Sequence, residues 1–159
     1  GGRPQIKPNR LVSACLLGER CRYDGGHCYD PAVEELKKRA DVVPVCPETL
    51  GGLEAPRAPS EIVGGKGADV WNGTAKVLDA EGRDRTQAFL TGAKKAMEIC
   101  KRCGAHSALV KSNSPSCGYG TIYDGSFGDT KRGGNGVFTQ LLLDRGVRVV
   151  CDGDAAVRR

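Results

Sequence analysis

The chain has 159 residues, of which 5% are aromatic and 23 are glycine, and its formal net charge is +5. This length suits a single domain with its own hydrophobic core, which we expect at residues 10–159 after a flexible polar tail at residues 1–9. The scattered basic residues permit an anionic ligand or weak attraction to nucleic acid but require neither. The sequence shows no stretch of 18 apolar residues and no charged-then-apolar leader, so we expect a cytoplasmic protein without membrane contact.

The first part of the chain predicts a strand, a helix and a second strand. A short apolar strand is predicted at residues 10–14. A helix follows, with Asp30 at its cap and Pro31 in its first turn. The second strand is predicted at residues 42–45, but Pro44 has no N–H for a sheet ladder, which argues against a central position in a sheet.

The rest of the chain alternates irregular and regular segments. Residues 53–72 are rich in glycine and proline, and they are too long for a plain connection, so we expect this excursion to fold over another part of the protein as a wall or lid. The later predicted elements are a strand at 75–79, a helix at 85–103 capped by Gly104, a strand at 107–110, a helix at 137–145 and a strand at 147–150.

Alternation of strands and helices indicates an α/β fold. We predict a single three-layer domain with a mainly parallel central sheet, similar to a Rossmann fold. In such sheets ligands bind beyond the carboxyl ends of the strands. Cys15, Cys46 and Cys117 each follow a predicted strand. Three thiols are therefore expected to converge on one edge of the sheet.

Three converging thiols are compatible with two kinds of metal site. A structural zinc needs four ligands, for which His27 or Cys21 could supply the fourth, although the paired knuckles typical of zinc sites are missing. An iron–sulfur cluster is normally held by four thiolates, so three would leave one iron open, as in a reactive site. Both alternatives remain at this point.

The remaining cysteines have simpler interpretations. Cys100 and Cys103 lie on the apolar face at the end of the helix predicted at 85–103, so core packing is favoured over a redox pair. Cys151 follows the last predicted strand and is interpreted as a buried cysteine at the sheet edge. A ligand role for Cys21, Cys28 or Cys151 is left open.

Five segments together resemble the 2-thiouracil desulfidase family. They are Val12-Ser13-Ala14-Cys15-Leu16-Leu17-Gly18, Cys21-Arg22-Tyr23-Asp24-Gly25-Gly26, Pro44-Val45-Cys46-Pro47-Glu48, Leu50-Gly51-Gly52 and Lys111-Ser112-x-Ser114-Pro115-Ser116-Cys117-Gly118. The resemblance covers about residues 10–151. It implies a [4Fe-4S] cluster held by Cys15, Cys46 and Cys117, with Glu48 and Ser114 as catalytic residues. The implied reaction removes sulfur from a thiolated pyrimidine without net redox change.

The residue types fit this chemistry. Glu48 lies two residues after Cys46, so its carboxylate can reach the same pocket and take a proton from a water that attacks the thiocarbonyl carbon. Ser114 lies three residues before Cys117 and can donate a hydrogen bond or relay a proton.

Three further residues are predicted to bind substrate. Tyr23 and Tyr119 lie in loops near the cysteines, and stacking of a base on an aromatic ring is worth ~1–3 kcal/mol. Ser112 belongs to the same loop as Ser114. The expected partner is a small thiolated pyrimidine base or nucleoside, with thiolated RNA as an alternative substrate. A different class of function is a non-enzymatic zinc or cluster-binding sensor, which would need neither Glu48 nor Ser114.

Overall fold

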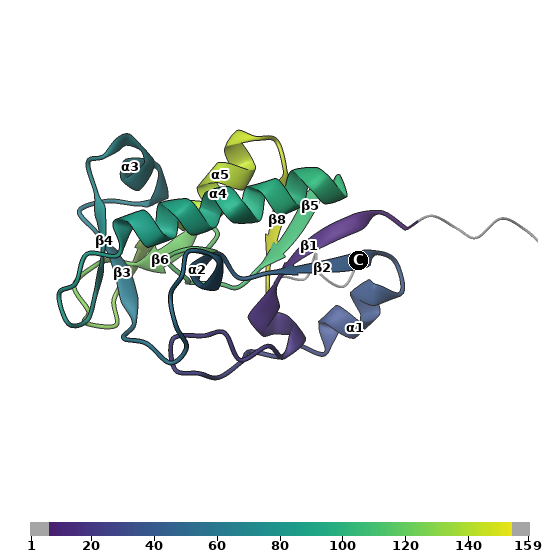
Figure 1. Ribbon diagram of the computed structural model, residues 1–159, viewed down its shortest axis with the longest axis horizontal. Coiled ribbons are helices and arrows are strands. Elements are labelled where there is room, and N and C mark those ends of the chain that lie inside the picture. Colours follow the sequence, from purple (N-terminus) through teal and green to yellow (C-terminus); the bar gives the residue numbers. More distant parts are fainter. Residues whose placement is uncertain (1–6, 154–159) are drawn as a thin grey trace, which may run out of the picture.

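The computed structural model describes residues 7–153 and contains a central sheet of four parallel strands. In sheet order these are β2 (Asp41–Val45), β1 (Asn9–Ser13), β5 (Ser107–Val110) and β8 (Arg148–Cys151) (Figure 1). The predicted α/β fold with a mainly parallel sheet is confirmed. Pro44 lies in β2 at the edge of the sheet, as its missing N–H requires.

The start of the sheet differs from the prediction. The first strand begins at Asn9, which was assigned to the flexible tail, because Asn9 pairs with Asp41 and its side-chain amide donates to the carbonyl oxygen of Cys103 at 2.6 Å. Residues 1–6 of the predicted tail lie outside the described residues. The prediction of one domain over residues 10–159 stays a prediction.

Helices cover both faces of the sheet (Figure 1): α1 (Ala32–Lys37) packs on one face, and α4 (Thr86–Cys103) and α5 (Val137–Asp144) pack on the other. Side chains of a strand alternate between the two faces. In β1, Leu11 accordingly belongs to the apolar cluster under α4 and α5, whereas Val12 belongs to the cluster under α1. These two clusters make the three-layer arrangement.

Two glycines allow α4 to touch α2 (Pro47–Leu50), the short helix directly after β2. A Cβ atom at Gly92 would lie 1.8 Å from the carbonyl oxygen of Pro47, and a Cβ atom at Gly51 would lie 2.0 Å from that of Ala88. Only residues without a side chain permit this backbone contact. It fixes the position of α2, the helix that carries Glu48.

Several small elements surround the sheet. The first is the one-turn 3-10 helix η1 (Ala14–Leu17) after β1. The excursion predicted at residues 53–72 contains β3 (Ser60–Val63) and α3 (Gly67–Asn72), and β3 pairs in an antiparallel way with β4 (Lys76–Asp79). A second antiparallel pair joins β6 (Thr121–Tyr123) to β7 (Lys131–Gly133). Within the described part of the chain, no helix is long and apolar enough to cross a membrane.

The sheet has a topological switch point between β1 and β5, where the chain changes the side of β1 on which it adds strands. The chain leaves β1 to form β2 on one side, and it later returns to form β5 on the other side of β1. The carboxyl ends of strands at such a switch point are the usual ligand-binding place in open α/β sheets. The loops after β1, β2 and β5 carry the predicted site residues.

Candidate metal centre and active site

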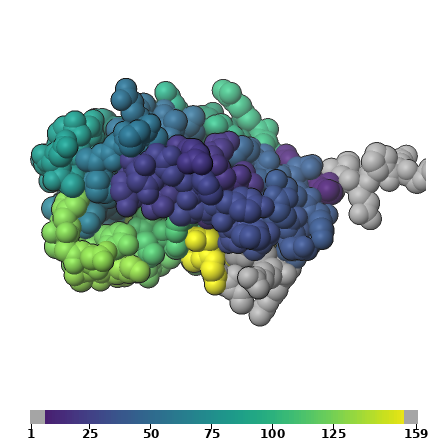
Figure 2. Space-filling model, turned by 90° about the horizontal axis from the view of Figure 1, so that it is seen from below, coloured from purple at the N-terminus to yellow at the C-terminus, as the bar shows by residue number. Residues whose placement is uncertain are grey.

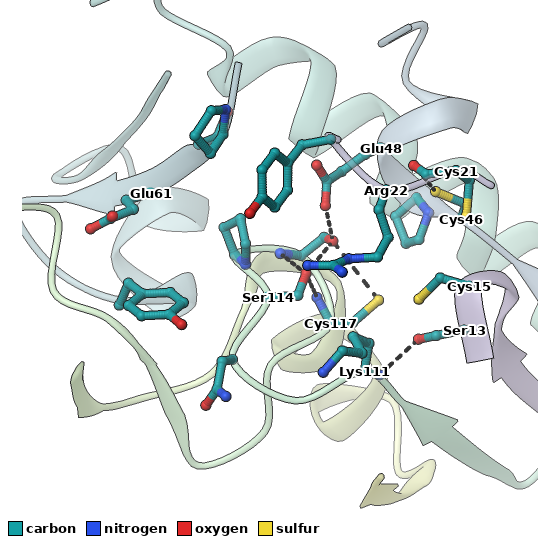
Figure 3. A pocket seen from close by; sticks show the side chains of 18 of the residues that line it. Ser13, Cys15, Cys21, Arg22, Cys46, Glu48, Glu61, Lys111, Ser114 and Cys117 are labelled. Atoms are coloured by element: carbon teal, nitrogen blue, oxygen red, sulfur yellow. Dashed lines mark hydrogen bonds between the residues drawn. The ribbon is translucent and has the colours of Figure 1, made fainter. Parts of the chain in front are cut away.

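A cavity of about 520 Å³ lies beyond the carboxyl ends of β1, β2 and β5 (Figure 3). Its lining comes from five stretches of the chain, residues 13–23, 45–48, 57–61, 111–117 and 123–129, together with Ala80. The excursion at 53–72 thus forms a wall of the cavity. Figure 2 shows how the N-terminal segment (purple) lies between segments from the middle (teal) and the later part (green) of the chain on one side of the molecule.

The structure brings the thiols of Cys15, Cys46 and Cys117 to this cavity. Cys15 lies in η1, Cys46 forms the N-cap of α2, and Cys117 lies in the loop after β5. A fourth thiol, that of Cys21, also lines the cavity and forms hydrogen bonds with Cys15 and Cys46. All the cysteines in the described part of the chain are free of disulfides.

The surroundings of Cys46 and Cys117 raise the pKa of both thiols. Burial raises the pKa of Cys117 to about 12, although hydrogen bonds from Ser13 and Ser116 act in the opposite direction. A hydrogen bond with Cys21, together with burial, raises the pKa of Cys46. A metal that binds here must therefore displace protons, as metal binding by thiols generally does.

The donor set fits an iron–sulfur cluster. Sulfur-only ligation suits iron–sulfur clusters, and the three cysteines predicted as ligands line one shared cavity together with Cys21. Within residues 7–153, no three His, Cys, Asp or Glu side chains come together closely enough to hold a single metal ion. The arrangement therefore differs from the compact tetrahedron of a structural zinc site.

Both carboxylate oxygens of Glu48 have partners. The guanidinium of Arg57 lies 3.0 Å from Oε1, and the hydroxyl of Ser116 donates to Oε2 at 2.8 Å. The side chains of Arg57 and Glu48 are only 9% and 15% exposed. Arg57 also donates to the carbonyl oxygen of Cys21 at 3.0 Å, so it connects the excursion to the thiol-bearing loop. Glu48 is thereby held in one orientation toward the cavity (Figure 3).

Ser114, Ser116 and Glu48 form a directed chain of hydrogen bonds. The Ser114 hydroxyl oxygen accepts the backbone N–H groups of Ser116 and Cys117, both at 3.1 Å, and lies 2.9 Å from the Ser116 hydroxyl oxygen. An ionised carboxylate only accepts hydrogen bonds. When Ser116 donates to Glu48, the proton between the two serines therefore belongs to Ser114. Protons can move along this chain from Ser114 toward Glu48.

The first turn of α5 fixes the loop that holds these serines. The backbone N–H groups of Val137 and Phe138 donate to the carbonyl oxygens of Pro115 and Ser116 at 2.8 and 2.9 Å. The Thr139 hydroxyl donates to the carbonyl oxygen of Cys117 at 2.6 Å. The loop therefore uses N–H groups that a helix start otherwise leaves without partners.

The comparisons with known proteins agree with this geometry. The family model described as 2-thiouracil desulfurase matches residues 11–154. The chain belongs to this family. It is 44% identical over 144 residues to the uncharacterized protein YbbK of Bacillus subtilis (strain 168), a match that covers 91% of this chain and 95% of that protein. It is also similar to the solved structure of the [4Fe-4S]-dependent thiouracil desulfidase TudS, with a TM-score of 0.82, 36% identity and 94% of each chain covered. The resemblance found in the five sequence segments is confirmed.

In this member of the 2-thiouracil desulfurase family, the predicted substrate-binding residues lie in different places. Ser112 and Tyr23 line the cavity, and Tyr23 packs under the guanidinium of Arg22, which lies 5.4 Å from the ring centroid. Among the described residues that line the cavity are Tyr123 and Phe127 but not Tyr119. Spacing along the loop could not distinguish these aromatic residues, because the β6–β7 hairpin was not predicted.

Three cavity residues were not identified as functional from the sequence. Ser116 stands inside a segment that carries the resemblance, yet its bond to Glu48 depends on the fold. Arg57 lies in the irregular excursion, where no local pattern marks it. Lys111 lines the cavity, and its ammonium group lies 3.3 Å from Asp152 and 3.0 Å from the hydroxyl of Ser112.

The other cysteines, Cys28, Cys100, Cys103 and Cys151, lie outside the described lining of the cavity. The thiol of Cys100 donates to the carbonyl oxygen of Ala105, and that of Cys103 donates to the carbonyl oxygen of Cys100, which is the core packing expected for the end of α4. Cys28 packs against the apolar cluster under α1, and Cys151 against the cluster under α4 and α5.

Proposed function

We propose that this protein is a [4Fe-4S]-dependent desulfidase that converts a small thiolated pyrimidine, 2-thiouracil or its nucleoside, into the oxygen analogue and sulfide. The observation that carries the proposal is the meeting of three thiols with the Ser114–Ser116–Glu48 chain in one cavity. A sensor would need the thiols alone. Membership of the 2-thiouracil desulfurase family and the similarity to TudS support the same activity.

Cys15, Cys46 and Cys117 would hold the cluster as thiolates. When bound, the cluster supplies an open iron that acts as a Lewis acid and polarises the thiocarbonyl group. Glu48 accepts a proton from the water that adds to the thiocarbonyl carbon. The carbon–sulfur bond then breaks, so that 2-thiouracil and water give uracil and hydrogen sulfide, and no electrons are transferred.

The remaining residues of the cavity orient the reactants. Arg57 and Ser116 hold the Glu48 carboxylate, and Ser114 provides the next hydroxyl along which a proton moves. Tyr23 offers an aromatic surface to the pyrimidine ring, and Ser112 offers a hydroxyl. Residues 10–159 would act as a single domain in this reaction.

The proposal is tested with anaerobically reconstituted protein, by assays of iron, sulfide and uracil formation from 2-thiouracil. Replacing Cys15, Cys46 or Cys117 by alanine should abolish cluster absorbance, whereas Cys100→Ala should keep it. Glu48→Gln should keep the iron but lose activity by ~10²–10⁴-fold, the usual contribution of positioned proton transfer. Glu54→Gln, at an exposed carboxylate shortly after α2, is the matched control. Near wild-type uracil formation by iron-loaded Glu48→Gln would remove Glu48 as the base.

A further inference from the structure

Phe127 lies at the cavity in an unusual backbone conformation. Its φ angle is +58°, in the left-handed region that bulky side chains rarely adopt. The side chain lines the cavity and remains 39% exposed. A strained, exposed aromatic residue at a ligand cavity requires an explanation, because neither core packing nor local backbone preference accounts for it.

The carboxylate of Glu61 holds this conformation. Oε1 of Glu61 accepts the backbone N–H groups of Gly125 and Phe127, at 2.9 and 3.3 Å. Glu61 belongs to β3, whereas Gly125 and Phe127 belong to the loop between β6 and β7, so one side chain joins two walls of the cavity. Figure 3 shows Glu61 within the cavity lining.

Close packing of the loop on β3 supports the same arrangement. A Cβ atom at Gly125 would lie 2.5 Å from the carbonyl oxygen of Ile62, so only glycine allows the loop to approach this strand. At the base of the loop, the N–H of Asp124 donates to the carbonyl oxygen of Thr130 at 2.9 Å. The loop is therefore anchored at its base and along one side, with Phe127 directed to the cavity.

We propose that the pyrimidine ring stacks on Phe127 in addition to the surface offered by Tyr23, and that Glu61 is the positioning residue that holds Phe127 there. This inference rests on the proposed function. A phenylalanine side chain has no hydrogen-bonding group, so its contribution to a flat heteroaromatic ligand is stacking and exclusion of water. The polar groups around Glu48 act on the reacting carbon and its water, whereas Phe127 acts on the face of the ring.

The test compares KM and kcat for 2-thiouracil with the Kd from calorimetric titration of the same compound. Phe127→Gly removes the ring and also relieves the strained φ angle, so the variant should fold. We expect its KM and Kd to rise about five- to hundredfold, with kcat near that of the wild type. Phe127→Tyr keeps the ring and should restore binding. Tyr119→Ala is the matched control, since this tyrosine is similarly exposed at 40% but lies outside the described cavity lining.

The positioning role of Glu61 is tested by comparing the effects of Glu61 and Phe127 substitutions on KM. Glu61→Ala should raise KM in the same way, whereas Glu61→Gln should keep KM low because the amide oxygen still accepts both N–H groups. Adding Glu61→Ala to Phe127→Gly should produce no further rise, as expected for residues that act as one unit. A further rise in the double variant would overturn the role of Glu61.

The outcomes separate this inference from the proposed function. If the wild type forms uracil and Phe127→Gly keeps its KM and Kd, stacking on Phe127 is overturned and the desulfidase stands. If the wild type binds 2-thiouracil but forms no uracil, the proposed function fails, and the change in Kd of Phe127→Gly still decides the stacking role. Absence of binding by the wild type overturns both.

Discussion

At the scale of single residues, the ion pair between Arg57 and Glu48 is the contact on which the orientation of the proposed base depends. Both side chains are largely buried, and the charge of Glu48 has Arg57 as its cationic partner in the described structure. Removing one partner of a buried pair leaves an uncompensated charge, which is more costly than losing the attraction itself.

Arg57→Gln should therefore lower the free energy of unfolding by about 3–5 kcal/mol. The double variant Arg57→Gln with Glu48→Gln should be more stable than Arg57→Gln alone, because no unpaired carboxylate remains. Urea unfolding followed by circular dichroism measures both values. Additive effects of the two substitutions would show that the ion pair carries no coupling energy.

The chain of hydroxyls gives a second prediction at this scale. Ser114→Ala and Ser116→Ala should both keep the cluster, since neither hydroxyl is a proposed ligand, and both should slow uracil formation. If the two serines form one path to Glu48, the double variant should be about as slow as the slower single variant. Rate losses that multiply in the double variant would mean that the two serines act independently.

The sequence was informative about residues that follow strands. Cys15, Cys46 and Glu48 could be placed near one another because parallel strands deliver their carboxyl ends to one edge. Arg57 could not be placed, because its contact with Glu48 depends on the path of the excursion through space. Tyr119 was predicted to bind substrate from its position in the loop, but the described lining of the cavity contains Tyr123, at the end of β6, and not Tyr119.

At the scale of elements, the contact between α2 and α4 connects the core to the site. Gly92→Ala would place a methyl group against the carbonyl oxygen of Pro47, so α2 must shift. We expect a loss of stability of about 1–3 kcal/mol or more, the usual effect of overpacking, together with a lower iron content. Urea unfolding and iron analysis check this result. Thr91→Ala, at an exposed neighbouring position on α4, should be neutral or slightly stabilising.

Asp79, the last residue of β4, gives a prediction for how the stability of the fold depends on pH. Burial opposes ionisation of Asp79, but hydrogen bonds from Arg83, Glu81 and Arg85 outweigh it and lower the pKa of this carboxyl from 3.8 to about 2. A carboxyl group with a lower pKa in the folded state stabilises the fold above its unfolded pKa and loses this effect as pH falls toward about 2.

Asp79→Asn should therefore destabilise the protein at neutral pH, and its difference from the wild type should shrink between about pH 4 and pH 2. Chemical unfolding of both proteins across this range measures the difference. A difference that stays constant with pH would contradict the assignment of the stabilising charge to Asp79. Glu54→Gln serves as the control for removal of an exposed carboxylate.

The regular elements that were not predicted from the sequence are short, and the strands among them are stabilised by pairing with other strands. The helices predicted at 85–103 and 137–145 and the strands of the central sheet were correct within a few residues. By contrast, α3 has six residues, and β6 and β7 have three each, too few for a hydrophobic period to develop. β3 is stabilised as a strand by its pairing with β4, and the local sequence of β3 does not reveal this pairing.

At the scale of the whole molecule, the sequence indicated the fold class but left the strand order open. In the order β2-β1-β5-β8, the topological switch point lies between β1 and β5. Alternation of strands and helices requires right-handed crossovers, but it does not say on which side of β1 the later strands add. That choice decides which loops line the cavity.

The assembly of the cavity from distant stretches also bears on how the protein matures. β1 and the thiol of Cys15 in η1 are synthesised early, whereas β5, the second neighbour of β1, begins only at Ser107, and Cys117 follows later still. A chain still emerging from the ribosome therefore lacks both a central strand and one of the three proposed ligands. A cluster held by all three cysteines therefore needs a chain synthesised at least to Cys117, whose loop is fastened to α5 in the folded protein.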